Sequence, residues 1–269
     1  MERIKQALDK ARAERGSERG VGGGAPMSTG ASSAPETGIE YSQTKVQTFD
    51  PNVLKSKCVV VDDSNKMGLT AYKMLRTQVM QRMTARGWNA LAITSPAPGD
   101  GKTVTAINLA ISLARELHHT VLLVDMDLRN PSVHRYFGLE PTVGISDYLL
   151  HSVPMNEVLI NPGIERLVLL PGRTSVENSS EILASPTMGK LVQELKTRYP
   201  SRMVIFDLPP LLAADDALSF APYVDAFLLV FRDGKTTKTE VDHSMQILRD
   251  VPIIGTVLNG SDERLSSYY

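Results

Sequence analysis

The stretch AITSPAPGDGKTVTAINLA, residues 92–110, restricts the fold of this chain more than any other stretch. Its apolar beginning predicts a strand, PAPGDG predicts a loop, and residues 102–117 carry apolar side chains at helical spacing. Gly99 and Gly101 allow the backbone N–H groups of the loop to turn towards an anion, and the start of the helix adds its positive end. A strand, a glycine-rich loop and a helix in this order predict a phosphate-binding loop.

The residues of this loop have separate expected roles. Lys102 is expected to reach the β- and γ-phosphates of a nucleotide, and the Thr103 hydroxyl to bind Mg²⁺. An alternative is that the glycines only shape the turn, but a lysine at a helix start opposes the helix dipole unless an anion is present. The predicted nucleotide-binding residues are Pro98, Gly99, Asp100, Gly101, Lys102, Thr103 and Val104. Pro96 stands where the general pattern G-x-x-x-x-G-K-S/T has its first glycine.

The rest of the chain alternates apolar runs with helical patterns, which predicts an α/β fold with a mostly parallel sheet and helices on both faces. With 269 residues, 42% of them hydrophobic, the chain can bury one sizeable core of this kind. The expected strands are 58–61, 90–95, 120–127, 166–172, 203–209, 226–232 and 252–259, and the expected helices are 67–86, 102–117, 178–197 and 236–249.

Aspartates end two of the expected strands. Asp125 and Asp127 close TVLLVDMD, and because residues alternate faces along a strand, both can point the same way. Asp207 closes MVIFD. Neighbouring carboxylates repel unless a cation lies between them, and beside a phosphate loop that cation would be Mg²⁺. The alternative for each aspartate is a helix N-cap.

Composition and charge exclude several classes of function. A net charge of −1 favours no nucleic acid or anionic membrane as a partner. Cys58 is the single cysteine, which excludes an internal disulfide and fits a cytoplasmic protein; we expect it to pack in a strand. No apolar run is long enough to span a bilayer, so any membrane role is expected to come through a partner.

Four ordered motifs resemble those of the bacterial tyrosine kinases of the polysaccharide co-polymerase type. They are SPAPGDGKT, VLLVDMDLRNPSVHRYFG, VIFDLPPLLAADDA, and VDAFLLVFRDGKT with IIGTVLN, and together they cover about residues 58–260. The resemblance implies a P-loop NTPase fold of the ParA/MinD-like superfamily. The beginning of the chain resembles the soluble members found with PEP-CTERM/exosortase exopolysaccharide loci.

This resemblance implies a protein-tyrosine autokinase that uses ATP and Mg²⁺ and regulates exopolysaccharide chain length or export. It implies a transmembrane chain-length-determinant protein as activator, a homo-oligomer, and recruitment to the inner face of the cell membrane. For single residues, the resemblance implies that Lys102 and Thr103 hold phosphate and Mg²⁺ and that Asp127 and Asp207 help to place the metal. It implies that Asp125 is the base that takes the tyrosine proton and that Asn259 faces the adenine. The implied phosphoacceptors are Tyr268 and Tyr269. Arg129 has two interpretations, a phosphate contact or a surface ion pair.

The expected domains follow from the same motifs. We expect an amphipathic helix over residues 1–15, a flexible Gly/Ser/Pro-rich linker over 16–52, a kinase domain over 53–260, and a mobile tyrosine-bearing tail over 261–269.

Two departures bear on alternative functions. ParA/MinD-like ATPase switches carry K-G-G-x-G-K-S/T, and here Ala97 and Pro98 occupy the first two positions, which favours the kinase over the switch. The ring-forming helix motif E-x-x-R-x-x-R of the kinases is represented by Thr70, Lys73 and Arg76. Lysine does not reproduce the planar fork of arginine, so this departure also leaves open a regulatory nucleotide-binding subunit.

Overall fold

The computed structural model describes residues 45–47, 49, 51–60, 65–116, 119–199 and 201–261. The predicted helix over 1–15, most of the predicted linker, and Tyr268 and Tyr269 lie outside the described residues. Among the described helices, none has the length and apolar character that a membrane span requires.

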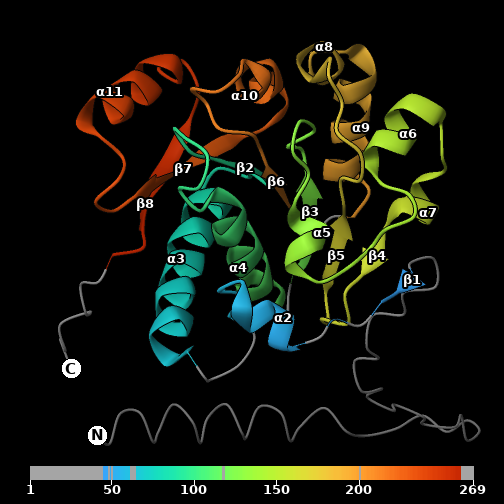
Figure 1. The fold of residues 1–269 in the computed structure, drawn as a ribbon, viewed down its shortest axis with the longest axis horizontal. Helices are drawn as coiled ribbons and strands as arrows, with labels where there is room; N and C mark the ends of the chain where they lie inside the picture. The colour runs from blue at the N-terminus through green and yellow to red at the C-terminus, as the bar shows by residue number, and fades with distance from the viewer. Residues whose placement is uncertain are drawn as a thin grey trace, which may run out of the picture. The chain divides into compact units, whose positions relative to one another are not determined.

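One eight-stranded sheet organises the described residues, in the order β1-β4-β5-β3-β6-β2-β7-β8 (Figure 1). All neighbours are parallel except β4 and β5. The strands are β1 (Lys45–Val46), β2 (Ala90–Thr94), β3 (Thr120–Asp125), β4 (Ile160–Asn161), β5 (Leu167–Leu170), β6 (Arg202–Asp207), β7 (Ala226–Arg232) and β8 (Ile253–Asn259). The expected α/β fold with a mostly parallel sheet is confirmed.

Helices cover both faces of the sheet, and each face has its own apolar core. On one face α2 (Pro51–Ser56), α3 (Lys66–Thr84) and α4 (Lys102–Ala114) contribute side chains, and nearly every residue of α4 is buried. The other core takes side chains from α6 (Ile145–His151), α7 (Met155–Val158), α8 (Ser179–Leu183), α9 (Pro186–Thr197) and α10 (Asp216–Phe220). The remaining helices are α5 (Val133–Tyr136), the 3₁₀ helix η2 (Ala221–Tyr223) and α11 (Lys238–Ile247).

The register of the central strands brings their acidic ends together. Asp125 lies opposite Asp207 in the β3–β6 ladder, and Ile93 lies opposite Asp207 in the β2–β6 ladder. Because these strands are parallel, the phosphate loop after β2 and the segments after β3 and β6 emerge at the same edge, where ligands bind in open α/β sheets.

Two of the expected elements are wrong in detail. No strand forms over the described residues 58–60; Cys58 is exposed in a turn, with a φ of 59°. The expected helix over 178–197 is divided at Ser185, whose Oγ accepts a hydrogen bond from Met188 N (3.2 Å) and caps α9 ahead of Pro186. This is the usual N-terminal signal of a helix, an N-cap serine followed by proline.

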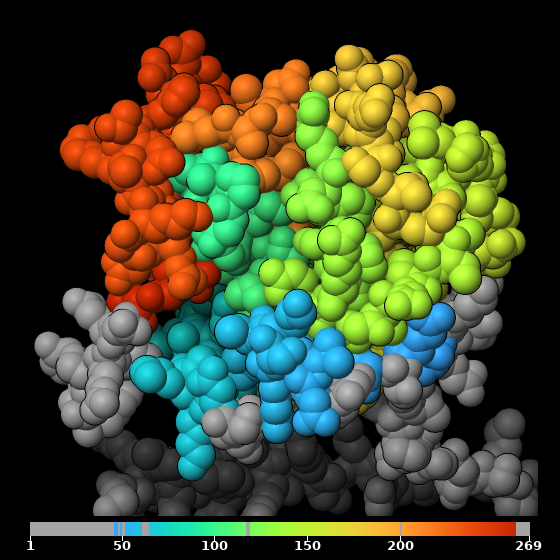
Figure 2. All heavy atoms as spheres, in the orientation of Figure 1, coloured from blue at the N-terminus to red at the C-terminus, as the bar shows by residue number. Residues whose placement is uncertain are grey.

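Two elements begin inside the range that the sequence assigns to the linker. Strand β1 pairs with β4, and α2 buries Leu54 completely. Figure 2 shows the blue atoms of α2 lying against the cyan helix α3 and the green residues near α5. Val53 is close enough to Gly138 that a Cβ there would lie 3.3 Å from Val53 Cγ1. Short apolar contacts therefore hold α2 on the domain, and a composition-based boundary does not detect them.

Candidate active site

The phosphate loop joins the end of β2 to the start of α4 in a conformation that requires glycine. Gly99 and Gly101 have φ angles of 83° and 97°, in the left-handed region. A Cβ on Gly101 would lie 1.8 Å from Asn259 Nδ2, so a side chain there would displace the amide group of Asn259. Gly101 is therefore required by its φ angle, and its lack of a side chain lets Asn259 reach the loop.

Hydrogen bonds tie the beginning of the loop to the segment after β6. Thr94 Oγ1 donates to Pro209 O (2.7 Å), and Leu212 N donates to Pro96 O (3.1 Å). Pro96 lacks an N–H group, but its carbonyl is what the structure uses at this position. These hydrogen bonds thus hold the beginning of the phosphate loop against the segment after β6.

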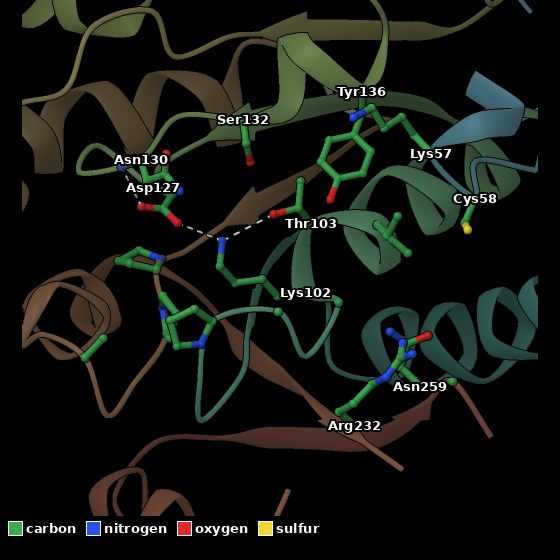
Figure 3. Close-up of a pocket in the computed structure, with 18 of the residues that line it drawn as sticks. Lys57, Cys58, Lys102, Thr103, Asp127, Asn130, Ser132, Tyr136, Arg232 and Asn259 are labelled. Atoms are coloured by element: carbon green, nitrogen blue, oxygen red, sulfur yellow. Dashed lines mark hydrogen bonds and ion pairs between the residues drawn. The ribbon is translucent and has the colours of Figure 1, made fainter. Parts of the chain in front are cut away.

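At the C-terminal end of the loop, Lys102 lies among buried acidic side chains (Figure 3). Its Nζ is 2.8 Å from Asp127 Oδ2, 3.5 Å from Asp207 Oδ1 and 3.3 Å from Thr103 Oγ1. Thr103 Oγ1 in turn donates to Asp207 Oδ2 (2.6 Å). We call Lys102, Thr103, Asp127 and Asp207 the lysine–aspartate cluster.

The charges of the cluster depend on one another. Burial opposes the charge of Lys102, but the carboxylates of Asp207 and Asp127 outweigh it and raise the pKa of Lys102 to about 12. Burial raises the pKa of Asp207, although Lys102 and Thr103 favour its charged form. Burial, with the nearby charge of Asp207, raises the pKa of Asp125 to about 7. The ammonium group of Lys102 is the cation that offsets these buried carboxylates.

Asp125 and Asp127 have different hydrogen-bond partners, and a shared orientation of the two carboxylates stays a prediction. Strand β3 ends at Asp125, so Asp127 lies beyond the strand. Asp125 Oδ2 accepts hydrogen bonds from the backbone N–H groups of Ser132 (2.8 Å) and Val133 (2.9 Å). Asp127 faces Lys102 instead, and its Oδ1 accepts a bond from Asn130 N (3.0 Å).

A cavity of about 900 Å³ opens beside the cluster. Of the predicted site residues, it is lined by Pro98, Gly99, Gly101, Lys102, Thr103, Val104, Asp127 and Asn259, whereas Asp100, Asp125 and Asp207 are buried behind its surface. A cavity of this size is within the range of small-molecule and cofactor sites. The structure therefore brings most of the predicted residues to a single cavity.

Other lining residues were not predicted from the sequence. Tyr136 lies within the LRNPSVHRYFG stretch, at the end of α5, Arg232 ends β7, and Lys57 lies after α2 (Figure 3). Arg232 could have been predicted, because it is a charged residue at the end of an apolar strand. Tyr136 and Lys57 line the cavity through tertiary packing, which no strand-end pattern indicates. Arg129 also lines the cavity, but its guanidinium is paired with Asp216 (Nη2–Oδ1 2.9 Å).

Asn259 lies where β8 meets the phosphate loop. Its Nδ2 donates to Asp100 O (2.9 Å), so in this structure its amide group is bonded to the loop backbone. The predicted adenine contact stays a prediction.

The cluster fits a magnesium nucleotide better than a free metal ion. Within the described ranges, no group of three acidic, histidine or cysteine side chains forms a complete metal site. Mg²⁺ usually binds proteins through one or two carboxylates, with phosphate oxygens and waters as the other ligands. Thr103, Asp127 and Asp207 supply a hydroxyl and two carboxylates of this kind.

Known proteins are similar to this chain in both sequence and fold. A family model described as an AAA domain matches residues 89–224. The tyrosine-protein kinase YwqD of Bacillus subtilis is 32% identical over 218 residues, which are 80% of this chain and 91% of YwqD. This chain belongs to the bacterial tyrosine kinase family.

The tyrosine-protein kinase Etk of Escherichia coli is 33% identical to this kinase over 213 residues, 78% of this chain and 29% of Etk. The kinase thus spans nearly all of YwqD but less than a third of Etk. The solved kinase domain of Etk matches with a TM-score of 0.68 and 34% identity, covering 75% of this chain and 78% of that domain. The septum-site-determining protein MinD of Pyrococcus horikoshii, solved with Mg-ADP, matches with a TM-score of 0.54 and 23% identity. The match covers 64% of this chain and 71% of MinD, and this similarity supports the fold alone.

The residues Thr70, Lys73 and Arg76, which stand at the positions of the family's ring-forming motif, lie on α3. Thr70 and Lys73 are exposed, whereas Arg76 is partly buried: its Nη1 donates to Ser112 O of α4 (3.1 Å), and its Nε pairs with Glu116 Oε1 (3.0 Å), just after α4. The retained arginine is therefore accounted for by contacts within one chain.

Proposed function

We propose that this kinase transfers the γ-phosphoryl group of ATP to tyrosines in the tail of a neighbouring copy and so regulates exopolysaccharide polymerisation or export. The observation that carries the proposal is the lysine–aspartate cluster at the end of a glycine-dependent phosphate loop, beside a cavity of about 900 Å³. Family membership favours phosphoryl transfer to tyrosine over other reactions of this fold.

Bound MgATP would supply the transferable phosphoryl group and the divalent charge that offsets the carboxylates. Lys102 would then exchange its contact with Asp127 for the β- and γ-phosphates, and Thr103, Asp127 and Asp207 would hold the metal. Phosphoryl transfer depends mainly on positioning and charge stabilisation, and a buried site with fixed donors provides both.

Asp125 is the proposed base for the tyrosine hydroxyl. Its Oδ2 is held by two backbone N–H groups, whereas its Oδ1 has no hydrogen-bond partner in the described part of the chain and is free to accept a proton. Because Asp125 is completely buried, an acceptor hydroxyl reaches Oδ1 only after a local movement of the segment after β3.

The acceptors in this proposal are Tyr268 and Tyr269. Ser261, the last described residue before these tyrosines, lines the cavity, which supports their choice as acceptors. A transmembrane chain-length-determinant protein as activator, a homo-oligomeric state and a cytoplasmic location at the inner membrane face complete the proposal. Phosphate on the tail would change assembly by adding negative charge.

The test compares ATP consumption with tyrosine modification. We expect the purified chain with MgATP, alone or co-expressed with its membrane partner, to form phosphotyrosine, detected by mass spectrometry, with release of ADP. Lys102→Met should abolish both. Release of ADP without any phosphotyrosine would instead favour the ParA/MinD-like ATPase switch.

A further inference from the structure

The loop between β7 and α11 contacts the phosphate loop through Lys235. Its Nζ donates to Pro98 O (2.8 Å) and lies 3.5 Å from Asp100 Oδ1. Gly99 permits this approach, because a Cβ at that position would be 3.2 Å from Lys235 Nζ. Lys235 does not line the cavity and reaches the nucleotide site only through the loop.

Asp100 is a buried negative charge inside a loop that binds negative charge. Its Oδ2 accepts a hydrogen bond from Ala97 N (2.9 Å), and its Oδ1 has no hydrogen-bond partner among the described residues. The Lys235 ammonium is the cation that the structure places beside that oxygen. Without it, the carboxylate would repel a triphosphate and would bear the cost of burial without a compensating charge.

The turn that carries Lys235 is itself fixed at the end of β7. Lys235 N and Thr236 N both donate to Arg232 O (3.2 and 2.9 Å), and Arg232 N donates to Thr236 Oγ1 (2.7 Å). Thr237 then caps α11, because its Oγ1 accepts from Glu240 N (3.2 Å). Lys235 therefore extends from a short hydrogen-bonded turn, so the backbone from which its side chain reaches the loop is already ordered.

We infer that Lys235 is a positioning residue for nucleotide binding, which holds the phosphate loop through Pro98 O and neutralises the carboxylate of Asp100. It acts with Asn259, whose Nδ2 donates to Asp100 O (2.9 Å), so that the turn after β7 and the end of β8 together fix the loop. The inference rests on the proposed nucleotide site, but it makes no use of the identity of the phosphoacceptor.

The test is calorimetric binding of MgADP to the full chain. Lys235→Met should raise Kd about three- to ten-fold, and KM for MgATP should rise with kcat nearly unchanged, because ground-state and transition-state binding are weakened alike. Lys235→Arg should restore binding to within about two-fold, since a cation is retained. In the Asp100→Asn background, Lys235→Met should change Kd by less than about two-fold, because the charge that it neutralises is gone.

The matched control is Lys238→Met. Lys238 carries the same charge three residues later and pairs with Asp242 (2.5 Å) on the exposed surface of α11, away from the phosphate loop. If Lys235→Met and Lys238→Met weaken MgADP binding equally, the inference is overturned. It is also overturned if Lys235→Met weakens MgADP binding equally in the wild-type and the Asp100→Asn backgrounds. Absence of MgADP binding in the wild type would overturn the proposed function together with it, whereas binding without tyrosine phosphorylation would overturn only the kinase proposal.

Discussion

The lysine–aspartate cluster depends on charge neutralisation within a few ångströms. Buried carboxylates cost free energy unless a cation or hydrogen-bond donors meet them. Lys102 and Thr103 meet Asp127 and Asp207, and the N–H groups of Ser132 and Val133 meet Asp125. Each of the three carboxylates therefore has its own donors. Bound MgATP would have to replace the ammonium group of Lys102 beside Asp127 and Asp207.

Lys102→Met should lower stability as well as activity. Removing the cation leaves Asp127 and Asp207 buried without it, and we expect the free energy of unfolding to fall by about 3 kcal/mol. Urea denaturation of the nucleotide-free chain measures this change. Lys238→Met removes an exposed lysine and should leave stability within about 0.5 kcal/mol. Equal stabilities of the two variants would show that the cluster is not held by charge.

Gly101→Ala should abolish nucleotide binding. The φ angle of 97° costs an alanine about 1–2 kcal/mol, and the added Cβ would overlap Asn259 Nδ2, 1.8 Å away. Gly87→Ala is the control, since Gly87 has a φ of 66° but no atom within 4 Å of an added Cβ. Thermal melts and MgADP titration should show a stability loss in both variants and a binding loss in Gly101→Ala alone. Retained binding in Gly101→Ala would contradict this geometry.

At the scale of elements, the long buried strands and the amphipathic helices were predictable, and the short elements were not. β2, β3, β5, β6 and β7 appear in the sequence as continuous apolar runs, which is typical of strands covered on both faces. β8 has a similar apolar run, although it lies at the edge of the sheet and only Ile254 is buried in it. α5 and α7 have four residues each, too few to display a helical period. β1 and β4 have two residues each, and their pairing depends on tertiary contacts alone.

Helix α3 offers a test of what Arg76 does. Its guanidinium bonds Ser112 O on α4 and pairs with Glu116 just after α4, so Arg76→Ala should lower the free energy of unfolding by about 1–2 kcal/mol. Lys73→Ala, at an exposed position one turn earlier, should leave stability within about 0.5 kcal/mol. Chemical denaturation gives both values. If Arg76→Ala changes the oligomeric state without changing monomer stability, the arginine serves assembly and not the α3–α4 contact.

At the scale of the whole molecule, the sequence located the site but not its internal geometry. The phosphate loop and the aspartates at strand ends indicated one edge of the sheet, and the parallel order of β3, β6 and β2 brings them together there. Asp125 and Asp127 have different hydrogen-bond partners, because β3 ends at Asp125 and Asp127 lies beyond it. The contact of Lys235 with the loop joins residues more than a hundred positions apart. Neither feature has a local sequence signal.

Removal of Mg²⁺ should affect ligand binding and not folding. Lys102 already neutralises the carboxylates of the nucleotide-free chain, so a chelator should leave its melting temperature unchanged. ADP at about 100 times its Kd should add about 3 kcal/mol of stability when Mg²⁺ is present and much less with the chelator. Differential scanning calorimetry distinguishes these cases. Unfolding by the chelator alone would mean that a resident metal, and not Lys102, holds the cluster.

The most direct test of the kinase assignment is a mixing experiment between two variants. The first variant carries Tyr268→Phe and Tyr269→Phe and keeps the lysine–aspartate cluster, and the second is Lys102→Met with its tyrosines intact. With MgATP, mass spectrometry should find phosphate on Tyr268 or Tyr269 of the Lys102→Met chain only when the first variant is present. Consumption of ATP by the first variant, with no phosphotyrosine on the second, would contradict the account.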